Sequence, residues 1–450
     1  MIQVFVDRKY EMEVLEKEWK RNRASFAIIY GRRRVGKTEI VRKFLQGKRG
    51  VYYLADRRDD KSNRADFQRA VEDSGIKDFS LYRFDDWVLL FKKLCEEVRN
   101  ERYAVVIDEF PYLVRESTLS QFQKAWDLYI KNSRIFLILV GSSISMMERL
   151  TLDYSSPLYG RRTMQLRVEK MQFWDAWKFL PDYDFYDFLR IFAVTDGIPH
   201  YILQMNPSLS WRENIKRNVL SKDKILYEEA EFLLRMELRE FTHYYPILEA
   251  IARGKRKFGE IRDYTGIEPA TLSKYLKNLR EIGVVRENSP IFGRERNKRY
   301  ILGDNYFSFY FGFIKPYRRY LEIEEVDAAW NKMKDSFNTY VGRILEDVIR
   351  KYLEKKYPGM EIGAWWNRKG QEIDIIGINR ESKEAFVGEV KLNKELGKRE
   401  LKKLRELSRD INELKKYRVR YILIAPKIRV VDEDVIALTI NDIARDMKKL

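Results

Sequence analysis

The sequence predicts a multidomain α/β protein, and three changes of pattern along its 450 residues carry this prediction. The first third alternates short apolar runs with helical runs, as in a parallel sheet that helices cover on both faces. Three short helices and a basic β-hairpin follow in the middle of the chain, which is the layout of a winged helix-turn-helix. The last part combines an amphipathic helix with several short strands, which predicts a second α/β domain.

A chain of this length should hold two to four domains. We expect five segments, one of which is a connector and not a domain. In chain order they are an α/β core over 1–166, a helical lid over 167–240, a winged helix-turn-helix over 241–305, a helical connector over 306–335 and a C-terminal α/β domain over 336–450.

The composition excludes several classes of protein. Cys95 is the only cysteine, so neither an internal disulfide nor a cysteine-based zinc site can form. With only His200 and His243, histidine-ligated metals and a Ser-His-Asp hydrolase are disfavoured, and any bound metal is expected to have oxygen ligands. The formal charge of +18 favours a polyanionic partner such as nucleic acid, but abundant Lys, Arg and Glu also fit a heat-adapted surface.

The chain lacks the patterns of export and of membrane insertion. Its best apolar run, Ile135–Val140, is far shorter than the ~18 residues that a membrane span needs. The first residues do not combine a basic stretch with an apolar one, so no signal peptide is evident. We therefore expect a cytoplasmic protein without a membrane partner.

The first segment is expected to contain a sheet of buried parallel strands. The strand candidates are Ser25–Tyr30, Val51–Leu54, Tyr103–Ile107 and Ile135–Val140, and a helix is expected over Lys37–Leu45. From about Val168 to Glu240 the pattern becomes helical and aromatic, which indicates the lid.

A phosphate-binding loop is expected directly after the first strand. The run from Gly31 to Thr38 fits G-x-x-x-x-G-K-[ST] and lies between a strand and a helix, which is the context that the motif requires. Lys37 would reach the β- and γ-phosphates, and the Thr38 hydroxyl would bind Mg²⁺. The residues expected to contact the nucleotide here are Gly31, Arg32, Arg33, Arg34, Val35, Gly36, Lys37, Thr38 and Glu39.

Two adjacent carboxylates follow the third strand. Asp108 ends the apolar run and can hold Mg²⁺, and Glu109 can orient or deprotonate the attacking water. A pair of this kind also occurs in ordinary loops, but the phosphate loop upstream favours the catalytic interpretation.

Two further elements could act at the nucleotide. The fourth strand leads into Ser142 and Ser143, one of which could sense the γ-phosphate, although a simple turn would look the same. Arg161 and Arg162 follow, and an arginine near the γ-phosphate is a common device, but a solvated basic pair fits almost as well.

The winged helix-turn-helix is expected to comprise three helices and two strands. The helices are Tyr245–Ala252, Phe258–Tyr264 and Ala270–Ile282, and the strands are Val284–Glu287 and Arg299–Leu302. Basic residues on the third helix and in the hairpin favour contact with nucleic-acid phosphates, but a structural or protein-binding role stays open. These residues are Lys274, Lys277, Arg280, Arg294, Arg296, Lys298 and Arg299.

Charged residues fall on the expected elements of the C-terminal domain. Glu346 flanks the apolar stripe of a helix over Ser336–Tyr357, Asp374 lies on a strand over Glu372–Ile378, and Glu389 and Lys391 share one face of a strand over Ala385–Lys391. Charges on the inner face of a strand are costly unless they are paired or bound to metal.

The rest of this domain is expected to be a charged helix over Lys394–Tyr417 and a strand over Tyr421–Ala425. The layout is similar to the PD-(D/E)XK phosphodiesterase core, a restriction-endonuclease-like fold. In such a site Asp374 and Glu389 would hold Mg²⁺ and Lys391 would orient the water. The alternative is an ordinary surface Glu-x-Lys pair.

Several motifs together resemble the archaeal ATPase family, one of the AAA+-like signal-transduction ATPases of the STAND class. They are Phe5–Arg8, Tyr30–Thr38, Ile107–Phe110, Ser156–Arg161 and Asp196–His200. The resemblance implies an ATP site, places the segment with Arg8 near the adenine, and gives the Gly197–Pro199 segment a role in sensing nucleotide state. Family members often carry Gly-Gly before Ile-Pro, where this chain has Asp196-Gly197. The family often carries a C-terminal nuclease-like domain.

The leading hypothesis is an ATP-hydrolysing switch, associated with DNA and equipped with a metal-dependent nuclease domain. The alternative is a STAND-like signalling ATPase or transcription regulator whose nuclease-like domain only binds. ATP, Mg²⁺ and DNA are the expected ligands, and a homo-oligomer or a partner protein would fit either hypothesis.

Overall fold

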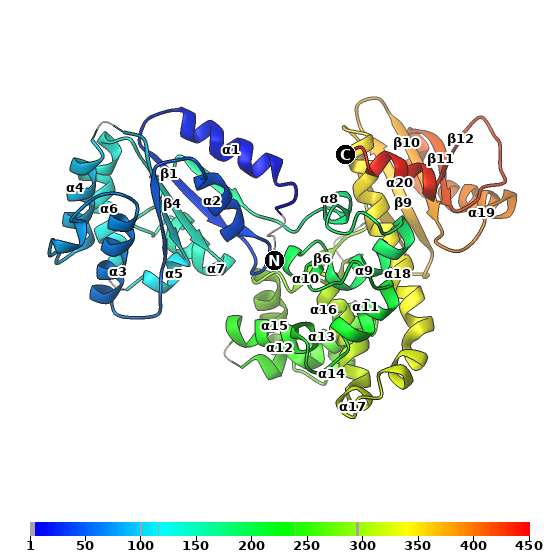
Figure 1. Cartoon of the computed structure of the whole chain (residues 1–450). Coiled ribbons are helices and arrows are strands. Elements are labelled where there is room, and N and C mark those ends of the chain that lie inside the picture. The colour runs from blue at the N-terminus through cyan, green and yellow to red at the C-terminus, as the bar shows by residue number, and fades with distance from the viewer. Residues whose placement is uncertain (1–4, 100, 116, 239, 294–296) are drawn as a thin grey trace. The chain divides into compact units, whose positions relative to one another are not determined.

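A computed structural model describes residues 5–99, 101–115, 117–238, 240–293 and 297–450. The chain divides into two compact units (Figure 1). The first comprises Met1–Met171 with Ile198–His200, and the second comprises Gln172–Gly197 with Tyr201–Leu450. Each unit is described by itself.

The first unit contains a five-stranded sheet in the order β2-β3-β4-β1-β5, in which all neighbouring strands are parallel. The strands are β1 (Ser25–Tyr30), β2 (Gly50–Leu54), β3 (Tyr103–Asp108), β4 (Ile135–Gly141) and β5 (Met164–Arg167). The four predicted strands are confirmed. Strand β5 was not predicted, because this short edge strand alternates buried and exposed residues and lacks a continuous apolar run.

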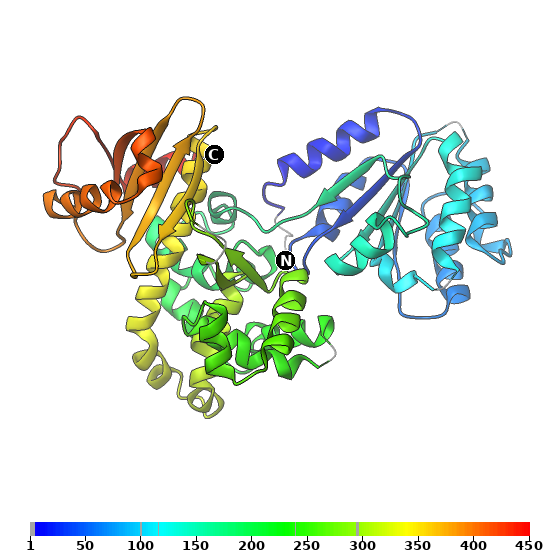
Figure 2. The ribbon, with the colours of Figure 1, turned by 180° about the vertical axis from the view of Figure 1, so that it is seen from behind.

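Helices cover both faces of this sheet, as predicted (Figure 1). Along β1, Phe26 and Ile28 belong to one apolar core and Ala27 and Ile29 to the other, because successive side chains point to opposite faces. The second core includes α1 and α2, and the first includes α3, α4 and α6. Seen from behind, the sheet again lies between these two layers (Figure 2). The helices are α1 (Lys9–Lys20), α2 (Lys37–Leu45), α3 (Asp60–Asp73), α4 (Trp87–Glu97), α5 (Phe110–Leu113), α6 (Thr118–Leu128) and α7 (Ile144–Met147), and α10 (Pro199–Ile202) begins here.

The second unit begins with helices that are rich in aromatic residues, as expected for 167–240. They are α8 (Phe173–Trp177), α9 (Phe185–Thr195), α11 (Trp211–Asn218) and α12 (Ile225–Glu237). The winged helix-turn-helix elements follow, within one residue of the predicted bounds: α13 (Tyr245–Ala252), α14 (Phe258–Thr265), α15 (Pro269–Glu281), β6 (Val285–Asn288) and β7 (Arg299–Leu302). Strands β6 and β7 form an antiparallel hairpin.

A single long helix joins the expected connector to the C-terminal domain. After α16 (Asn305–Phe309) and α17 (Lys315–Glu322), α18 runs for 31 residues from Val326 to Lys356. The expected boundary at 335/336 lies inside this helix, since the stretch 326–341 contains no proline or glycine and the buried stripe begins at Ala329. Neither α18 nor any other helix in the described ranges has both the length and the apolar character to cross a membrane.

The C-terminal sheet is mixed and has the order β12-β11-β10-β9-β8. β8, β9 and β10 are antiparallel, and β10, β11 and β12 are parallel. Helix α19 is shorter than the predicted helix over Lys394–Tyr417, because the α-helix ends at Arg409. A short 3₁₀ helix, Asn412–Lys416, follows it. The elements are β8 (Glu361–Trp366), β9 (Glu372–Asn379), β10 (Glu384–Val390), α19 (Lys398–Arg409), β11 (Arg418–Ala425), β12 (Val435–Thr439) and α20 (Ile440–Met447), and the last two had not been predicted.

Candidate nucleotide site and carboxylate cluster

The loop between β1 and α2 has the backbone that its glycines predict. Gly36 has a φ of 94°, and a Cβ on Gly31 would lie 2.3 Å from the carbonyl oxygen of Val168. Lys37 is buried, and its Nζ donates to the carbonyl oxygens of Gly31 (2.9 Å) and Arg32 (2.7 Å). The loop therefore holds the lysine ammonium group at its own carbonyl oxygens.

Asp108 collects hydrogen bonds from two neighbouring elements. Thr38 Oγ1, at the start of α2, donates to Asp108 Oδ2 over 2.7 Å, and Tyr52 Oη on β2 donates to the same oxygen over 2.8 Å. Burial and the Asp108 charge raise the pKa of Tyr52, so its hydroxyl stays a donor. The Thr38 hydroxyl and the Asp108 carboxylate form the hard oxygen set that suits Mg²⁺.

Tyr52 was not predicted as a site residue, because it belongs to no motif. A signal exists only in the register, since parallel pairing places Tyr52 opposite Val106, two residues before Asp108.

Glu109 and Ser142 meet at the edge of the sheet. Ser142 Oγ donates to Glu109 Oε1 over 2.8 Å, and Arg33 Nη1 lies 3.9 Å from the same oxygen. Glu109 has a φ of 49°, an uncommon conformation that turns it out of the end of β3. Of the two serines considered as sensors, Ser142 makes this contact, while Ser143 is the residue directly before α7.

Arg8 ties the phosphate loop to a distant segment. Its guanidinium donates to the carbonyl oxygens of Val35 (2.6 Å) and Glu169 (2.9 Å) and pairs with Glu11 (2.8 Å). The residue is buried, and its position near adenine stays a prediction. In the structure, Arg8 supports the phosphate loop through its hydrogen bond to the carbonyl oxygen of Val35.

The Pro199 segment reaches the phosphate loop through its neighbour. Pro199 begins α10, and Arg34 Nη1 lies 2.6 Å from Nε2 of His200. Because a guanidinium can only donate, this nitrogen accepts and the imidazole is neutral. Burial, with the charge of Arg34 in second place, lowers the pKa of His200 to about 4.

We expect this histidine to make the stability of the first unit depend on pH. The unfolded chain takes up a proton at His200 below pH ~6.5 and the folded chain only near pH 4, so the free energy of unfolding falls as the pH drops through this window. Solvent screening of the half-buried ring limits the loss to about 1 kcal/mol. Urea unfolding at pH 7 and pH 5 should show a smaller loss for His200→Gln than for the original chain. An equal loss would contradict this.

Arg161 and Arg162 both contact side chains of the first unit. Arg161 donates from Nε and Nη2 to the carboxylate of Asp127 on α6, the latter over 2.7 Å, and Arg162 lies 6.0 Å from the ring centre of Tyr159. A γ-phosphate role for Arg161 therefore stays a prediction that requires the ion pair to open.

The charged residues predicted for the C-terminal domain do come together. Lys391 Nζ lies 2.6 Å from Glu389 Oε1 and 3.3 Å from Asp374 Oδ2, an oxygen that also accepts from the Val390 amide (3.0 Å). Arg350, on α18, donates to the Asp374 carbonyl oxygen over 2.6 Å and lies 4.0 Å from Glu346 Oε2. Arg350 is the member that the sequence analysis missed, although it lies one helical turn after Glu346.

Burial raises the pKa of both glutamates in this cluster, with the Asp374 charge as the second cause. The pKa of Glu346 rises to about 8, and that of Glu389 rises as well. Arg350 also pairs with Asp347, so Lys391 and Arg350 only partly offset the four carboxyl groups around them. Among the residues that the structure describes, no three His, Cys, Asp or Glu side chains are arranged to hold a metal. Binding of Mg²⁺ by the two carboxylates of Asp374 and Glu389 therefore stays a prediction.

The hairpin of the winged helix is bound to the C-terminal sheet. The amide of Ile291 donates to the carbonyl oxygen of Ala364 on β8 (2.9 Å), and Trp366 Nε1 donates to the carbonyl oxygen of Asn297 (2.9 Å). Phe292 lies in the same apolar core as β9 and β10. The parts of the β6–β7 connection at Ile291, Phe292 and Asn297 thus belong to an internal interface.

The basic residues of the hairpin are engaged accordingly. Arg299 pairs with Glu372 over 2.7 Å and lies 4.4 Å from the ring centre of Trp366. Lys298 pairs with Glu287, which also pairs with Arg280 of α15. Arg294 and Arg296 lie outside the described residues. On α15, Lys274 is exposed, and Lys277 is exposed with Glu281 3.8 Å away.

Comparison with known proteins gives three domain matches. Residues 5–205 match an ATPase domain described as predominantly from Archaea, and residues 246–287 match the arsR family of bacterial regulatory proteins, a helix-turn-helix family. Residues 310–404 match a domain of archaeal and bacterial proteins of unknown function.

One relative and two solved structures resemble the chain over most of its length. An uncharacterized protein of Methanocaldococcus jannaschii is 35% identical over 439 residues, which cover 94% of this chain and 96% of that protein. A Walker-type ATPase of Pyrococcus abyssi has a TM-score of 0.52 at 23% identity, over 68% of this chain and 96% of that one. The ORC2 protein of Aeropyrum pernix, solved as ADPNP–ADP complexes, has a TM-score of 0.50 at 16% identity, over 74% and 98%. At such identities the likeness concerns the fold.

Proposed function

The chain belongs to the family of proteins that carry an ATPase domain predominantly from Archaea, and on that premise we propose that it is a Mg²⁺-dependent ATPase acting as a nucleotide switch on DNA. The observation that carries this proposal is the group formed by Lys37, Thr38 and Asp108 at one end of the parallel sheet. Ligands bind at the carboxyl ends of the strands in open sheets of this kind, which is where the three residues lie.

Each residue of the group has a defined task in this proposal. Lys37 would exchange the loop carbonyl oxygens for β- and γ-phosphate oxygens, which accept stronger, charge-assisted hydrogen bonds. Thr38 and Asp108 would hold Mg²⁺, which neutralises phosphate charge when it is bound. The Tyr52 hydroxyl, a donor to Asp108, would keep the carboxylate oriented.

Glu109 is the proposed base or water-orienting group. Its carboxylate is fixed by Ser142, so a water placed between them and the γ-phosphate would be oriented for attack. Ser142 is then the residue that links Glu109 to the end of β4.

Association with DNA is proposed to use α15 and not Arg299 of the hairpin. The exposed Lys274 and Lys277 lie on the helix that enters the groove in helix-turn-helix proteins, whereas Arg299 is held at Glu372 and Trp366. The match of residues 246–287, which include α15, supports this choice, and the net charge of +18 favours a polyanionic partner in general.

Charge reversal on α15 is expected to weaken DNA binding. Replacing Lys274 and Lys277 by Glu should lower the affinity for duplex DNA about 10-fold or more and reduce the salt slope by about 2, because two phosphate contacts are lost. Fluorescence anisotropy at several salt concentrations measures both effects.

The matched control for this experiment is Arg299→Glu, which changes a residue of the hairpin. It should leave the DNA salt slope unchanged and instead lower the thermal stability of the second unit, because its partner is Glu372. If the α15 variant binds DNA normally, the winged helix is a protein-binding or structural element.

A second candidate activity is metal-dependent cleavage of phosphodiesters at the cluster of Glu346, Asp374, Glu389 and Lys391. The raised pKa of Glu346, to about 8, supports it, because a divalent cation would relieve the repulsion between buried carboxylates. Asp374 and Glu389 would hold the ion and Lys391 would orient the water. The alternative keeps the cluster as part of a binding module without catalysis.

The proposed ATPase is tested by phosphate release from the full-length protein. Turnover should require Mg²⁺, stop when EDTA is added, resume when Mg²⁺ is restored in excess, and change when duplex DNA is present. Turnover that is indifferent to EDTA would contradict the roles of Thr38 and Asp108.

A further inference from the structure

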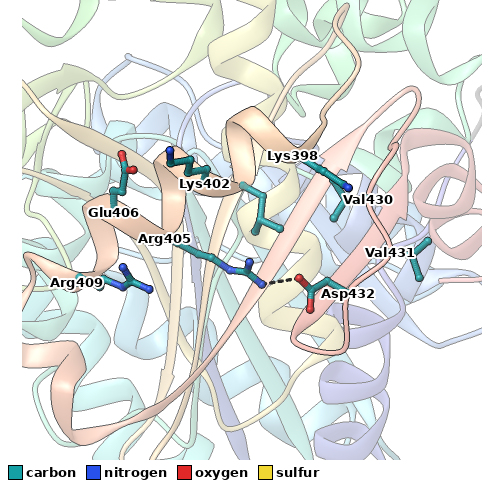
Figure 3. A pocket seen from close by; sticks show the side chains of 9 residues that line it. Lys398, Lys402, Arg405, Glu406, Arg409, Val430, Val431 and Asp432 are labelled. Atoms are coloured by element: carbon teal, nitrogen blue, oxygen red, sulfur yellow. Dashed lines mark hydrogen bonds and ion pairs between the residues drawn. The ribbon is translucent and has the colours of Figure 1, made fainter.

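A basic groove lies on the C-terminal domain, between α19 and the loop that precedes β12 (Figure 3). It encloses a pocket of ≈ 370 Å³. Leu401 and Val430 supply apolar side chains to its wall, and the charged residues of α19 line its length. None of these residues belongs to the nucleotide site, to the carboxylate cluster or to the winged helix.

Four cations of the groove form one stripe along α19. Lys398, Lys402, Arg405 and Arg409 are spaced three or four residues apart, so they follow a single face of the 12-residue helix over about 16 Å. The neighbouring face, with Leu401, Leu404 and Ser408, is buried against the sheet. Lys403 lies on the opposite flank, where its charge acts on Glu389.

Most of this positive charge is not neutralised within the protein. In the described part of the chain, Lys398, Lys402 and Arg409 have no carboxylate within ion-pair distance. Other surface lysines of this domain do have one, such as Lys351 on α18, which pairs with Glu354. Arg405 is the exception, because its guanidinium is held by Asp432 (2.8 Å) and Asp434 (2.5 Å) on the facing loop. Glu406 is the one further acid that lines the groove.

We propose that this groove binds the phosphodiester backbone of nucleic acid. A row of cations about 16 Å long suits a polymer that repeats its charge every ~3.4 Å of axis per strand, whereas one isolated phosphate would need converging donors. The proposal rests on the proposed function only in the choice of nucleic acid as the partner. It places a second contact on the chain, independent of α15.

The two carboxylates that pair with Arg405 would compete with a bound phosphate for its guanidinium. Asp432 and Asp434 occupy the guanidinium that a phosphate would use, so binding must displace them. Removing these two carboxylates should therefore strengthen binding, while removing the lysines should weaken it. Opposite effects from two walls of one groove are hard to obtain from a general change in stability.

The experiment measures binding of labelled duplex DNA, single-stranded DNA and duplex RNA to the full-length protein by anisotropy at several salt concentrations. The triple variant Lys398→Gln, Lys402→Gln, Arg409→Gln should lose about 10- to 100-fold in affinity at 0.1 M salt, with a salt slope lower by about 3. The control Lys355→Gln, Lys415→Gln, Lys416→Gln removes the same charge from exposed positions of the same domain and should change little. The pair Asp432→Asn, Asp434→Asn should tighten binding several-fold.

The three probes decide which nucleic acid is preferred, and a poly-glutamate competitor tests the other class of partner. Equal affinities and slopes for the triple variant and the control would overturn the proposal. So would poly-glutamate that binds the groove while the DNA slope stays unchanged, since the groove would then serve an acidic protein. A loss in the α15 variant alone would leave the proposed function standing and reject the groove.

Discussion

Lys37→Ala is expected to reduce ATP affinity by about 100- to 1000-fold, because two or more charge-assisted hydrogen bonds to the phosphates are lost. The change should leave the fold intact, since Lys37 Nζ donates to two carbonyl oxygens of its own loop, those of Gly31 and Arg32. Calorimetric titration with a non-hydrolysable ATP analogue measures the affinity, and thermal unfolding without nucleotide checks the fold.

Glu109→Gln is the complementary variant. The amide keeps the size of the side chain and can still accept from Ser142, so nucleotide binding should persist. Turnover should fall by about 100-fold or more, because the group that orients or deprotonates the water is lost.

The control for the second variant is Glu97→Gln, which makes the same chemical change on α4, where the carboxylate pairs with Lys93. It should change neither binding nor turnover. Unchanged turnover in Lys37→Ala or in Glu109→Gln would overturn the assignment of the nucleotide site.

The second large effect is expected at the carboxylate cluster. If the C-terminal domain cleaves nucleic acid, Glu389→Ala should abolish cleavage and lower metal affinity, while DNA binding persists or strengthens as carboxylate repulsion is relieved. Lys391→Ala should also abolish or strongly slow cleavage but leave metal affinity largely intact. The assay uses labelled DNA and RNA with Mg²⁺ or Mn²⁺, with and without ATP, and thermal shift with Mn²⁺ reports metal binding.

Glu384→Ala is the matched control, since Glu384 is exposed at the other end of β10. It should cleave as the original chain does. A contaminating nuclease would be indifferent to all three substitutions. Absence of cleavage by the original chain on every substrate would favour the binding-module alternative for this domain.

The two catalytic hypotheses differ in how directly the sequence supports them. The nucleotide site depends on one contiguous loop and one strand end, so the spacing Gly31 to Thr38 already determines how Lys37 and Thr38 lie. The carboxylate cluster joins a helix and two strands that are separated in sequence. Its members could be named from strand alternation, but Arg350, which bonds to the Asp374 carbonyl oxygen, became visible only in the structure.

Sequence patterns were sufficient wherever one local force dominates. Buried parallel strands read as continuous apolar runs, so β1, β3 and β4 could be placed almost to the residue, as could the helices of the winged segment. Strands β5 and β12 lack this signal, because β5 alternates buried and exposed residues and no residue of β12 is fully buried. The length of α18 was underestimated, because a helix was expected only from Ser336, although no proline or glycine ends the helix between residues 326 and 336.

The sequence by itself determined the phosphate loop, the carboxylate pair at Asp108 and the succession of parallel-sheet, winged-helix and mixed-sheet parts, since these depend on short-range periodicity and backbone chemistry. Only the tertiary structure decided that Tyr52 holds Asp108, that Ser142 holds Glu109, and that the hairpin at Arg299 is docked on the C-terminal sheet. These contacts join residues far apart in the chain, and their partners are chosen by packing and register. A side chain's type limits what it can bond to, but only the fold decides which partner lies within reach.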